Sequence, residues 1–558
     1  MSYRVFVVGL DGATFDLIRP WAQAGDLPTL ARLMGTGAWG ELRTTVPPMT
    51  GPAWTSFMTG QNPGKHGIFD WIARRSDAYD VMPLSARHRQ TRSLWALASQ
   101  AGRRVFVFNV PMTYPPEAVN GILIAGLPAP AARPDVAYPT NTYDEITRLV
   151  GSYILYPDPG QAYSDSGVDA FLSRLYRCTD DRIRILEHFW QQERWDLTMV
   201  VFNGTDAVQH ALWKYMDPSH PLHDRARAAQ YGDAILQFYR RMDAWLGTIL
   251  DSLDDDTVLM VMSDHGAGPF HKFIHVNNWL MREGFLCLRR TLLSQAKRLW
   301  FTVGFTPMQV YNLLMRLGLG AFKREVVRGR GQVLLKALFL SFAEVDWRRT
   351  QAYSLGNVGQ IFLNVRGREP LGCVARGADY ERVREAIMAG LMDLRDPDTG
   401  EAVIEQVFPR EEVYQGPYLD QAPDILFLPR NLEYFGFGEY EFGSNRVIEP
   451  VVRGISGTHR MNGVLLLAGR PIRAGQKIQG AQIVDLAPTI LHLLGLPVCS
   501  EMDGRVLTEA LTAPVRPASL PVAVSDPDWA GTPSDGDDFT ADDEEAVLER
   551  LRNLGYVG

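Results

Sequence analysis

Residues 46–71 read VPPMTGPAWTSFMTGQNPGKHGIFDW, and this stretch contains a threonine at the predicted start of a helix. Pro52 lies two residues after Thr50, a helical pattern begins at Ala53, and proline is favoured in the first turn of a helix. Thr50 is therefore predicted at or just before a helix N-terminus, where unpaired N–H groups and the helix dipole favour an anion. Its hydroxyl could cap the helix, or it could attack a bound phosphate if a base or a metal ion activated it.

Around this stretch, short apolar runs alternate with helix-like segments. The strand-like runs are rich in Val, Ile, Leu and Phe, and they are Val5–Leu10, Val105–Val110, Ile122–Ala125, Leu197–Phe202, Val258–Met262, Gln360–Val365, Ile425–Leu428 and Val464–Leu467. Helical patterns lie between them, at about 28–35, 93–101, 168–192, 223–254 and 484–495. This alternation predicts an α/β fold with a mostly parallel sheet whose strands are buried on both faces.

Composition limits the classes of protein to consider. The chain has 558 residues, more than one compact core usually holds, so we expect one large catalytic domain with insertions, or two domains. The net charge of −8 gives no support for binding a nucleic-acid polymer, because proteins that do so are more often basic. The four cysteines are widely separated and form no CxxC pair, which argues against a zinc knuckle or a disulfide framework.

The N-terminal apolar run ends at Asp11 and is too short for a signal peptide, whose apolar core spans about 7–15 residues. No stretch reaches the roughly 18 apolar residues of a membrane-spanning helix. We therefore expect a cytoplasmic protein.

Residues 286–343 differ from the rest of the chain, because basic and apolar residues alternate there. Between Leu286 and Leu340 the only acid is Glu325, and the bases are Arg289, Arg290, Lys297, Arg298, Arg316, Lys323, Arg324, Arg328, Arg330 and Lys336. We predict a helical cap inserted into the α/β domain. Three roles stay open: a cap with a solvated basic face, a lid that attracts an anionic substrate, and a face in peripheral contact with anionic lipid.

The composition shifts again near residue 512, where Pro, Asp, Gly and Ser become common and branched apolar residues become rare. We predict that residues 1–512 form the catalytic domain and that residues 513–558 form an acidic, mostly disordered tail. A short helix is predicted from Asp542 to Asn553.

Acids and histidines gather next to the predicted strands. They are Asp11 in the turn GLDG, Asp206 and His210 in GTDAVQH, Asp264 and His265 in SDHG, and His459 in GTH. Ligands of open α/β sheets bind at the carboxyl ends of the strands, and residues i and i+4 share one face of a helix. Each histidine alone is more often structural than a ligand, but together these carboxylates and imidazoles suit Zn²⁺ or Mn²⁺ better than Ca²⁺.

The ordered motifs GLDGA, MTGPAWTSFMTGQNPGKHGI, GTDAVQH, SDHG and GTH resemble those of the alkaline phosphatase superfamily. The pattern is most similar to the type I phosphodiesterase/nucleotide pyrophosphatase branch and to the predicted phosphohydrolase/phosphomutase proteins of bacteria and archaea. The stretch QIVDLAPTILHLLGLPVCSEMDGRVL resembles the end of that catalytic domain, so the resemblance covers roughly residues 3–512. It implies a three-layer α/β/α sandwich around the central sheet.

The resemblance also implies a mechanism. One divalent ion would be held by Asp11, Asp264 and His265 with Thr50, and the other by Asp206, His210 and His459. Zn²⁺ is the expected ion and Mn²⁺ the alternative. Thr50 would be the nucleophile of a phosphodiesterase or pyrophosphatase and would form a phospho-threonine intermediate, with a small-molecule or lipid head-group phosphoester as substrate.

Two features depart from the nucleotide pyrophosphatase pattern. That branch has an asparagine about twenty residues after its threonine, which holds a phosphate oxygen, whereas this chain reads Ile68-Phe69-Asp70-Trp71 there. Trp71 could stack on a substrate, although a buried aromatic is the more common case. The basic segment 286–343 is the second departure, and both leave nucleotide specificity open.

Related chemistries are weighed by single residues. A sulfatase is disfavoured because residues 50–54 lack the required Cys or Ser and Arg, and a cofactor-independent phosphoglycerate mutase normally uses serine in place of Thr50. A phosphomonoesterase would need extra positive charge, for which Lys65 and His66 are the nearest candidates. A phosphoryl or phospho-head-group transferase acting on lipid-linked or sugar substrates stays open. The full set of ligands argues against a non-catalytic binding protein.

Overall fold

The largest element of this computed structural model is a ten-stranded sheet whose central strands are parallel. The structure describes residues 2–163, 167–307, 309–310, 338–438, 442–452, 454–512 and 539–554. In sheet order the strands are β21 (Gln476–Lys477), β2 (Ala38–Arg43), β20 (Asn462–Ala468), β9 (Thr257–Met262), β1 (Arg4–Leu10), β8 (Leu197–Phe202), β5 (Val105–Phe108), β6 (Gly121–Ile124) and β7 (Ala137–Tyr138), with β22 (Ala481–Gln482) also paired to β2.

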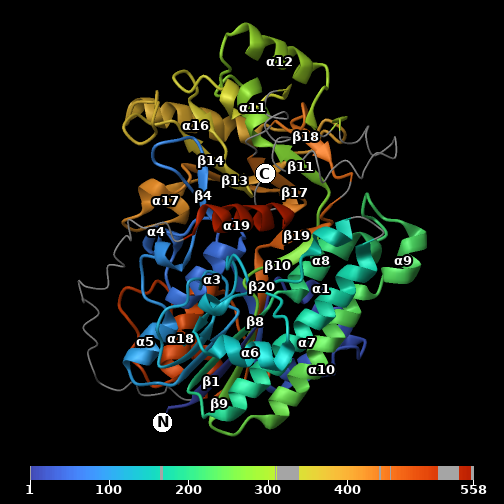
Figure 1. Cartoon of the computed structure of the whole chain (residues 1–558), viewed down its shortest axis with the longest axis vertical. Helices are drawn as coiled ribbons and strands as arrows, with labels where there is room; N and C mark the ends of the chain where they lie inside the picture. Colours follow the sequence, from blue (N-terminus) through green and yellow to red (C-terminus); the bar gives the residue numbers. More distant parts are fainter. Residues whose placement is uncertain are drawn as a thin grey trace.

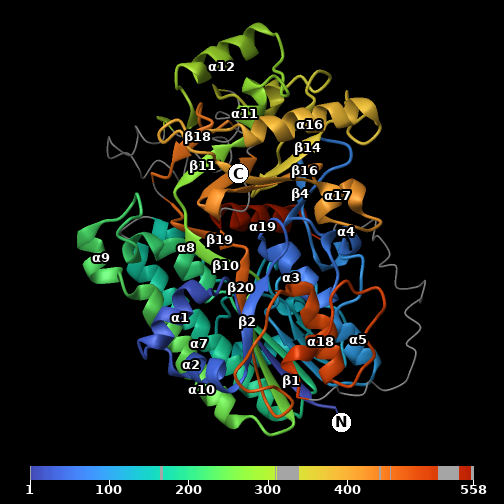
Figure 2. The same ribbon diagram turned by 180° about the vertical axis from the view of Figure 1, so that it is seen from behind.

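Helices cover both faces of this sheet, as the sequence predicts (Figures 1 and 2). One face is covered by α1 (Phe15–Gln23), α2 (Pro28–Thr36), α7 (Val168–Gln192), α8 (Gly204–Met216) and α10 (Ala234–Ser252), and the other by α3 (Thr50–Thr59), α5 (Leu94–Gln100) and α18 (Leu486–Leu493). The runs β8 and β9 are buried along their whole length, which is why they read as continuous apolar segments. The predicted α/β class with a mostly parallel central sheet is confirmed.

Two of the eight predicted strands lie outside the central sheet. The runs at 360–365 and 425–428 form β14 (Gln360–Leu363) and β16 (Ile425–Pro429) in an antiparallel sheet of order β12-β14-β16-β15. Periodicity identifies a buried strand but not the sheet to which it pairs. The prediction of one helical segment over 223–254 is also corrected, because α9 (Arg225–Tyr231) ends before Gly232 and α10 starts at Ala234.

A second region lies beyond the carboxyl ends of the central strands (Figures 1 and 2). It contains the sheet formed by β12 (Ala352–Tyr353), β14, β16 and β15 (Ile404–Pro409), and a second sheet formed by β13 (Gly356–Asn357), β17 (Tyr434–Gly438), β11 (Lys272–His275) and β18 (Ile448–Pro450). The helices α11 (Val276–Arg282), α12 (Leu292–Thr302) and α16 (Ala378–Met392) lie at the end farthest from the central sheet.

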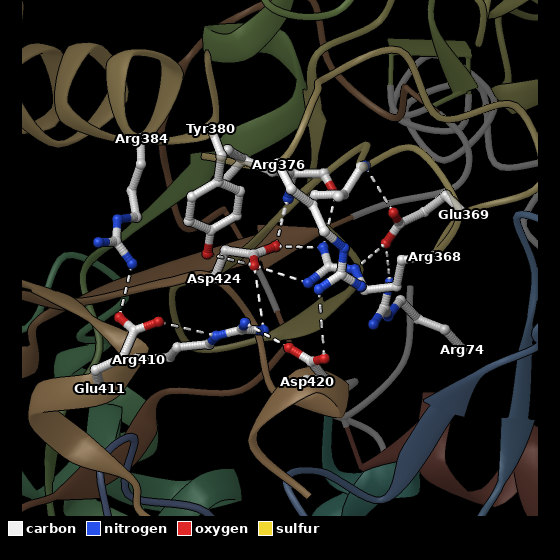
Figure 3. A network of polar contacts seen from close by, with 12 residues as sticks. Arg74, Arg368, Glu369, Arg376, Tyr380, Arg384, Arg410, Glu411, Asp420 and Asp424 are labelled. Atoms are coloured by element: carbon white, nitrogen blue, oxygen red, sulfur yellow. Dashed lines mark hydrogen bonds and ion pairs between the residues drawn. The ribbon is translucent and has the colours of Figure 1, made fainter. Parts of the chain in front are cut away.

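A network of buried ions holds this second region together (Figure 3). Asp424 accepts hydrogen bonds from Arg368 at 2.8 and 2.5 Å and from the hydroxyl of Tyr380 at 2.8 Å. Glu369 accepts from Arg368 at 2.8 Å and pairs with Arg74, which lies on the hairpin strand β3 (Ile72–Arg74). The network therefore joins the second region to the segment that follows α3.

The described part of the predicted cap contains α12, whereas residue 308 and residues 311–337 lie outside the description. The predicted linker at 513–538 lies outside it as well. The predicted C-terminal helix is present as α19 (Ala541–Asn553), where Asp543 pairs with Arg133 at 2.8 Å. The boundaries of the domain, the cap and the tail remain predictions. None of the helices among the described residues has both the length and the apolar character needed to cross a bilayer.

Candidate metal centre

Three central strands bring the predicted ligands to one edge of the sheet. Strand β1 pairs in parallel with β8 on one side and β9 on the other, so that Gly9 lies opposite Val201 and Met262. The chain leaves all three strands at the same level, and the carboxylates of Asp11, Asp206 and Asp264 follow directly. This is the edge at which open parallel sheets bind their ligands.

The first group consists of Asp206, His210 and His459. Asp206 and His210 lie one turn apart on α8, and His459 lies on β19 (Gly457–Arg460), which pairs with β10 (Gly266–Pro269). His210 Nε2 is 3.1 Å from Asp206 Oδ1 and 3.1 Å from His459 Nε2. Two nitrogens bound to one tetrahedral Zn²⁺ at about 2.0–2.1 Å would lie roughly 3.3 Å apart, so this spacing fits a shared ion.

The second group consists of Asp11, Asp264 and His265. His265 Nε2 lies 3.2 Å from Asp264 Oδ2 and 3.7 Å from Asp11 Oδ1. The imidazole rings of His265 and His459 stack with their centroids 3.6 Å apart, so the two groups are immediate neighbours. Such adjacent sites are suited to binding one phosphate between two ions.

Backbone carbonyls orient the three imidazoles. The Nδ1 atom of each ring lies within hydrogen-bonding distance of a carbonyl oxygen: Gly457 O at 2.6 Å for His210, Gly266 O at 3.0 Å for His265, and Pro48 O at 2.8 Å for His459. Since a carbonyl can only accept, these contacts assign the proton to Nδ1 in the neutral rings. The Nε2 lone pairs then face the carboxylates of Asp11, Asp206 and Asp264, as in histidines that bind metals.

The protein itself offsets little of the negative charge that Asp11 and Asp264 carry when they are ionised, and both side chains are buried. Burial, and then the neighbouring Asp264 and Asp206 carboxylates, raise the pKa of Asp11 well above its usual value. Burial and Asp206 raise the pKa of Asp264 to about 8. Among the described residues, Asp11 Oδ1 and Asp264 Oδ2 are buried oxygens without a hydrogen-bond donor. These oxygens, together with the three Nε2 lone pairs, fit two divalent cations of the Zn²⁺ or Mn²⁺ type.

The histidines respond to burial in different directions. Burial and the nearby His265 ring lower the pKa of His459 well below its usual value. Burial also lowers the pKa of His265. At His210 the effect of burial is outweighed by the Asp206 carboxylate, which raises its pKa. A metal ion at the first group therefore competes with a proton for His210.

Thr50 lies at this same edge and is the first residue of α3. The residue in the capping position is Met49 and not Thr50. Its Oγ1 lies 3.1 Å from His265 Nε2 and the residue is buried. The helix starts three residues earlier than the pattern from Ala53 suggests, which places the hydroxyl at the positive end of the helix dipole.

Asp70 and Trp71, which stand where the nucleotide pyrophosphatase pattern has an asparagine, are both buried. Trp71 is fully buried, and its ring packs on Gly51, so it is a core aromatic. Asp70 Oδ2 accepts a hydrogen bond at 3.0 Å from the side-chain amide of Gln360, which also lies 3.4 Å from Met49 Sδ. Gln360 thus brings an amide from β14 next to the start of α3, although Met49 lies 311 residues away in sequence.

Two further residues near the site, Asn203 and Tyr163, belong to none of the motifs recognised in the sequence. Asn203 donates to Asp11 Oδ2 at 2.8 Å and accepts from Asn109 at 2.7 Å, which fixes the Asp11 carboxylate. Tyr163 has a buried hydroxyl, and burial and the Asp206 carboxylate raise its pKa. The position of Asn203 at the end of β8 is the only hint that the sequence offers for either residue.

Comparison with known proteins agrees with this geometry. The family model described as type I phosphodiesterase / nucleotide pyrophosphatase matches residues 5–438. The chain belongs to this family.

Individual relatives are distant. The solved structure of human ectonucleotide pyrophosphatase/phosphodiesterase 5 (ENPP5, NPP5) is 13% identical over 91% of this chain and 100% of its own, with a TM-score of 0.50. The murine protein of the same name, in complex with AMP, is 12% identical over 89% of this chain and 96% of its own, with a TM-score of 0.48. A 2,3-bisphosphoglycerate-independent phosphoglycerate mutase of Cereibacter sphaeroides is 43% identical over 65 residues, which is 12% of either chain. The match to the human structure shows the fold and does not identify the substrate.

Proposed function

We propose that the protein is a phosphodiester hydrolase with two divalent ions and Thr50 as its nucleophile. The observation that carries this proposal is the position of Thr50 Oγ1, which is buried beside both Asp/His groups and 3.1 Å from His265 Nε2. A threonine hydroxyl needs activation before it attacks phosphorus, and these two groups fit the ions that would supply it.

Each residue then has a definite task. Asp11, Asp264 and His265 hold one ion beside Thr50, and Asp206, His210 and His459 hold the other. Divalent ions bound there would lower the pKa of the Thr50 hydroxyl and offset charge on the attacking and leaving oxygens. Zn²⁺ is the ion we favour, followed by Mn²⁺.

Thr50 Oγ1 forms the new bond to phosphorus while the bond to the leaving oxygen breaks. The resulting phospho-threonine is then hydrolysed by water, which restores the hydroxyl. The N-terminus of α3 presents the positive end of its dipole to the non-bridging oxygens. Asn203 holds Asp11 in place throughout, because its amide donates to Asp11 Oδ2.

Charge favours a diester over a monoester. The two groups and an ionised Thr50 together carry four negative charges, which two divalent ions balance, so a singly charged diester adds less repulsion than a dianionic monoester. Two cations close in sequence to site residues are used elsewhere: Lys65 pairs with Asp503 at 2.5 Å, and Arg460 donates to the carbonyls of Leu432 and Pro269.

His66 does not supply positive charge either. Burial and the nearby Arg89 lower its pKa to about 3, so the ring is neutral at physiological pH. Its Nε2 contacts Ser56 Oγ at 2.9 Å inside the core. A diester or pyrophosphate-type bond, in a nucleotide or in a lipid head group, is therefore the substrate class we propose.

A transferase would share the first half of this reaction, because Thr50 would be phosphorylated in the same way. The two differ in the acceptor, which is water in the hydrolase and an alcohol in the transferase. Product analysis in the presence of glycerol or a sugar alcohol separates them: free phosphomonoester supports the hydrolase, and a glycerol adduct in excess supports the transferase.

The test compares Thr50→Ala, Thr50→Ser and Thr59→Ala in hydrolysis of bis(p-nitrophenyl) phosphate with Zn²⁺ or Mn²⁺. Thr59 lies at the other end of the same helix, where its hydroxyl donates to Thr55 O at 2.7 Å. We expect Thr50→Ala to lose at least about 10⁴-fold in kcat, and Thr50→Ser and Thr59→Ala to keep most activity. Full activity in Thr50→Ala with an unchanged melting temperature would exclude Thr50 as the nucleophile.

A further inference from the structure

Helix α12 exposes apolar side chains and buries polar ones, which is the reverse of an ordinary surface helix. On its inner side Ser294, Lys297 and Phe301 are buried. The exposed side chains, with their exposed fractions, are Leu292 (88%), Leu293 (62%), Leu299 (63%), Trp300 (43%), Val303 (73%) and Phe305 (43%). Six of the eleven strongly exposed large apolar residues in the described part of the chain thus lie in one short segment, so they form a patch and are not scattered.

The patch follows helical geometry. Residues 292, 296, 299, 300 and 303 are spaced i, i+4, i+7, i+8 and i+11, which places them on one side of the helix. A helix of this length extends about 16 Å, so the apolar stripe is long enough to lie flat on a surface. We define the α12 apolar face as the exposed side chains Leu292, Leu293, Leu299, Trp300, Val303 and Phe305.

Contacts on the inner side fix the direction of this face. Lys297 Nζ donates to Glu344 Oε1 at 2.7 Å, and both side chains are buried. Phe301 packs edge-on against Phe442, with centroids 5.9 Å apart. Rolling the apolar face inward would break the buried ion pair, which is strongly unfavourable.

Positive charge lies beside the apolar face. A hollow of about 580 Å³ next to α12 is lined by four arginines, Arg289, Arg290, Arg298 and Arg349. These arginines stand out in a chain whose net charge is −8. An apolar face beside clustered arginines is complementary to a surface that is apolar inside and anionic outside.

The position of α12 argues against the two other roles considered for residues 286–343, a lid over the site and a cap with a solvated basic face. Figures 1 and 2 place α12 at the end of the molecule farthest from the central sheet, with the second region between it and the metal centre. It does not lie over Thr50, so it is not placed as a lid. A cap with a solvated basic face would not need to expose leucines and a tryptophan.

We propose that the α12 apolar face and the adjacent arginines dock this protein on the surface of an anionic phospholipid bilayer. The apolar side chains enter the boundary between head groups and acyl chains, with Trp300 at the interface, and the arginines bind lipid phosphates. This docking is independent of the proposed phosphodiesterase reaction, because no residue of the metal centre takes part.

The apolar part is tested with the full-length protein in vesicle sedimentation. Vesicles of phosphatidylcholine with phosphatidylglycerol are compared with vesicles of phosphatidylcholine alone, using the double variants L299S/W300S and L371S/M392S. Leu371 and Met392 are 42% and 44% exposed on other parts of the surface and serve as the matched control. We expect L299S/W300S to weaken binding to anionic vesicles by at least about tenfold, and L371S/M392S to bind as the wild type does.

The charged part is tested with R290E/R298E against R470E, an exposed arginine on another face. Reversing two charges near the surface should weaken binding at least about tenfold, and added salt should weaken the wild type in the same direction. Hydrolysis of a soluble diester should stay unchanged in all these variants, which shows that the fold persists.

Three outcomes would overturn the proposal. The wild type could fail to sediment with anionic vesicles, or L299S/W300S could bind as the wild type does. Alternatively, light scattering could show a dimer in solution that L299S/W300S converts to a monomer, with no vesicle binding by either. In that last case the face is an interface between two copies of the chain.

Discussion

Two groups of buried charges in this molecule are compensated in opposite ways. In the network between β14 and β16, Asp424 accepts hydrogen bonds from Arg368, Tyr380 and the backbone N–H of Leu363. Burial alone would raise the pKa of Asp424, but the bonds from Arg368 outweigh it and hold that pKa below its usual value. At the ends of the central strands, Asp11 and Asp264 are equally buried, yet their pKa values are raised.

The difference distinguishes a structural group of charges from a functional one. The Asp424 network supplies its own counter-charges, so it needs nothing from outside and stabilises the second region (Figure 3). Asp11 and Asp264 lack such counter-charges among the described residues and repel each other, so they destabilise the fold unless a cation binds. The comparison predicts opposite responses when the two groups are altered.

The largest effect is expected from Asp264→Asn. Removing this ligand should lower kcat/KM for a diester by at least about 10³-fold, which is about 4 kcal/mol of transition-state stabilisation. Above about pH 8, where Asp264 is ionised in the chelated wild type, the same change removes a buried, poorly compensated charge, so the chelated variant should have a free energy of unfolding roughly 1–3 kcal/mol higher than that of chelated wild type. Kinetics and urea unfolding of the two proteins measure both effects, and a destabilised chelated variant would contradict the contrast.

The next largest effect is expected from Arg368→Met in the compensated network. Loss of this guanidinium leaves Asp424 and Glu369 short of a partner, so the free energy of unfolding should fall by about 3–5 kcal/mol. Arg366→Met is the control, because Arg366 is exposed and its Nε donates only to the Cys373 carbonyl in the bonds described. At a temperature where Arg368→Met remains folded, its KM should match that of the wild type. Equal stability of the two variants would show that the network is not structural.

Much of the fold follows from the sequence, because burial on both faces of β1, β8 and β9 produces continuous apolar runs. Six of the seven site residues follow a strand end or lie on α3 or α8, and His459 lies on β19. The partners of these residues could not be predicted, because Gln360 reaches Asp70 from a different sheet and Asn203 is an ordinary residue in a turn. The exposed direction of α12 could not be predicted either, since it depends on Glu344 and Phe442, which lie far away in the chain.

A smaller effect is expected from pH on chelated protein. The folded pKa values of Asp11 and Asp264 lie above their unfolded values, so the folded state binds more protons and its stability falls as pH rises toward the folded pKa, about 8 for Asp264. Between about pH 7 and pH 8 the loss should be roughly 1 kcal/mol for Asp264, and Asp11 should contribute in the same direction. The lowered pKa values of His265 and His459 affect stability only at lower pH.

Saturating Zn²⁺ should abolish or reverse this pH trend, because the ion favours the deprotonated ligands. Urea unfolding at both pH values, with chelator and with Zn²⁺, is the measurement. A chelated protein that becomes more stable from about pH 7 to about pH 8 would contradict the raised pKa values.

The smallest effect is expected from Asp70→Asn. The Asp70 carboxylate accepts from the amide of Gln360, which lies 3.4 Å from the sulfur of Met49 next to Thr50, so it adds negative charge near the place where a substrate phosphate would bind. Replacing the carboxylate by an amide should raise kcat/KM for a nucleotide p-nitrophenyl ester by a few-fold, about 0.5–1 kcal/mol. Asp77→Asn, in the exposed turn of the same hairpin, should leave it unchanged. A decrease in Asp70→Asn would instead assign Asp70 a role in orienting Gln360.

The most direct test of the proposed metal centre is the number of metal ions bound per chain. Wild type and His210→Ala should be equilibrated with Zn²⁺, freed of excess ion, and assayed by mass spectrometry of the metal. Two separate Asp/His groups predict two ions per wild-type chain and one per chain in His210→Ala, which removes a ligand from one group alone. Fewer than one ion per wild-type chain, or the same number in both proteins, would contradict the assignment.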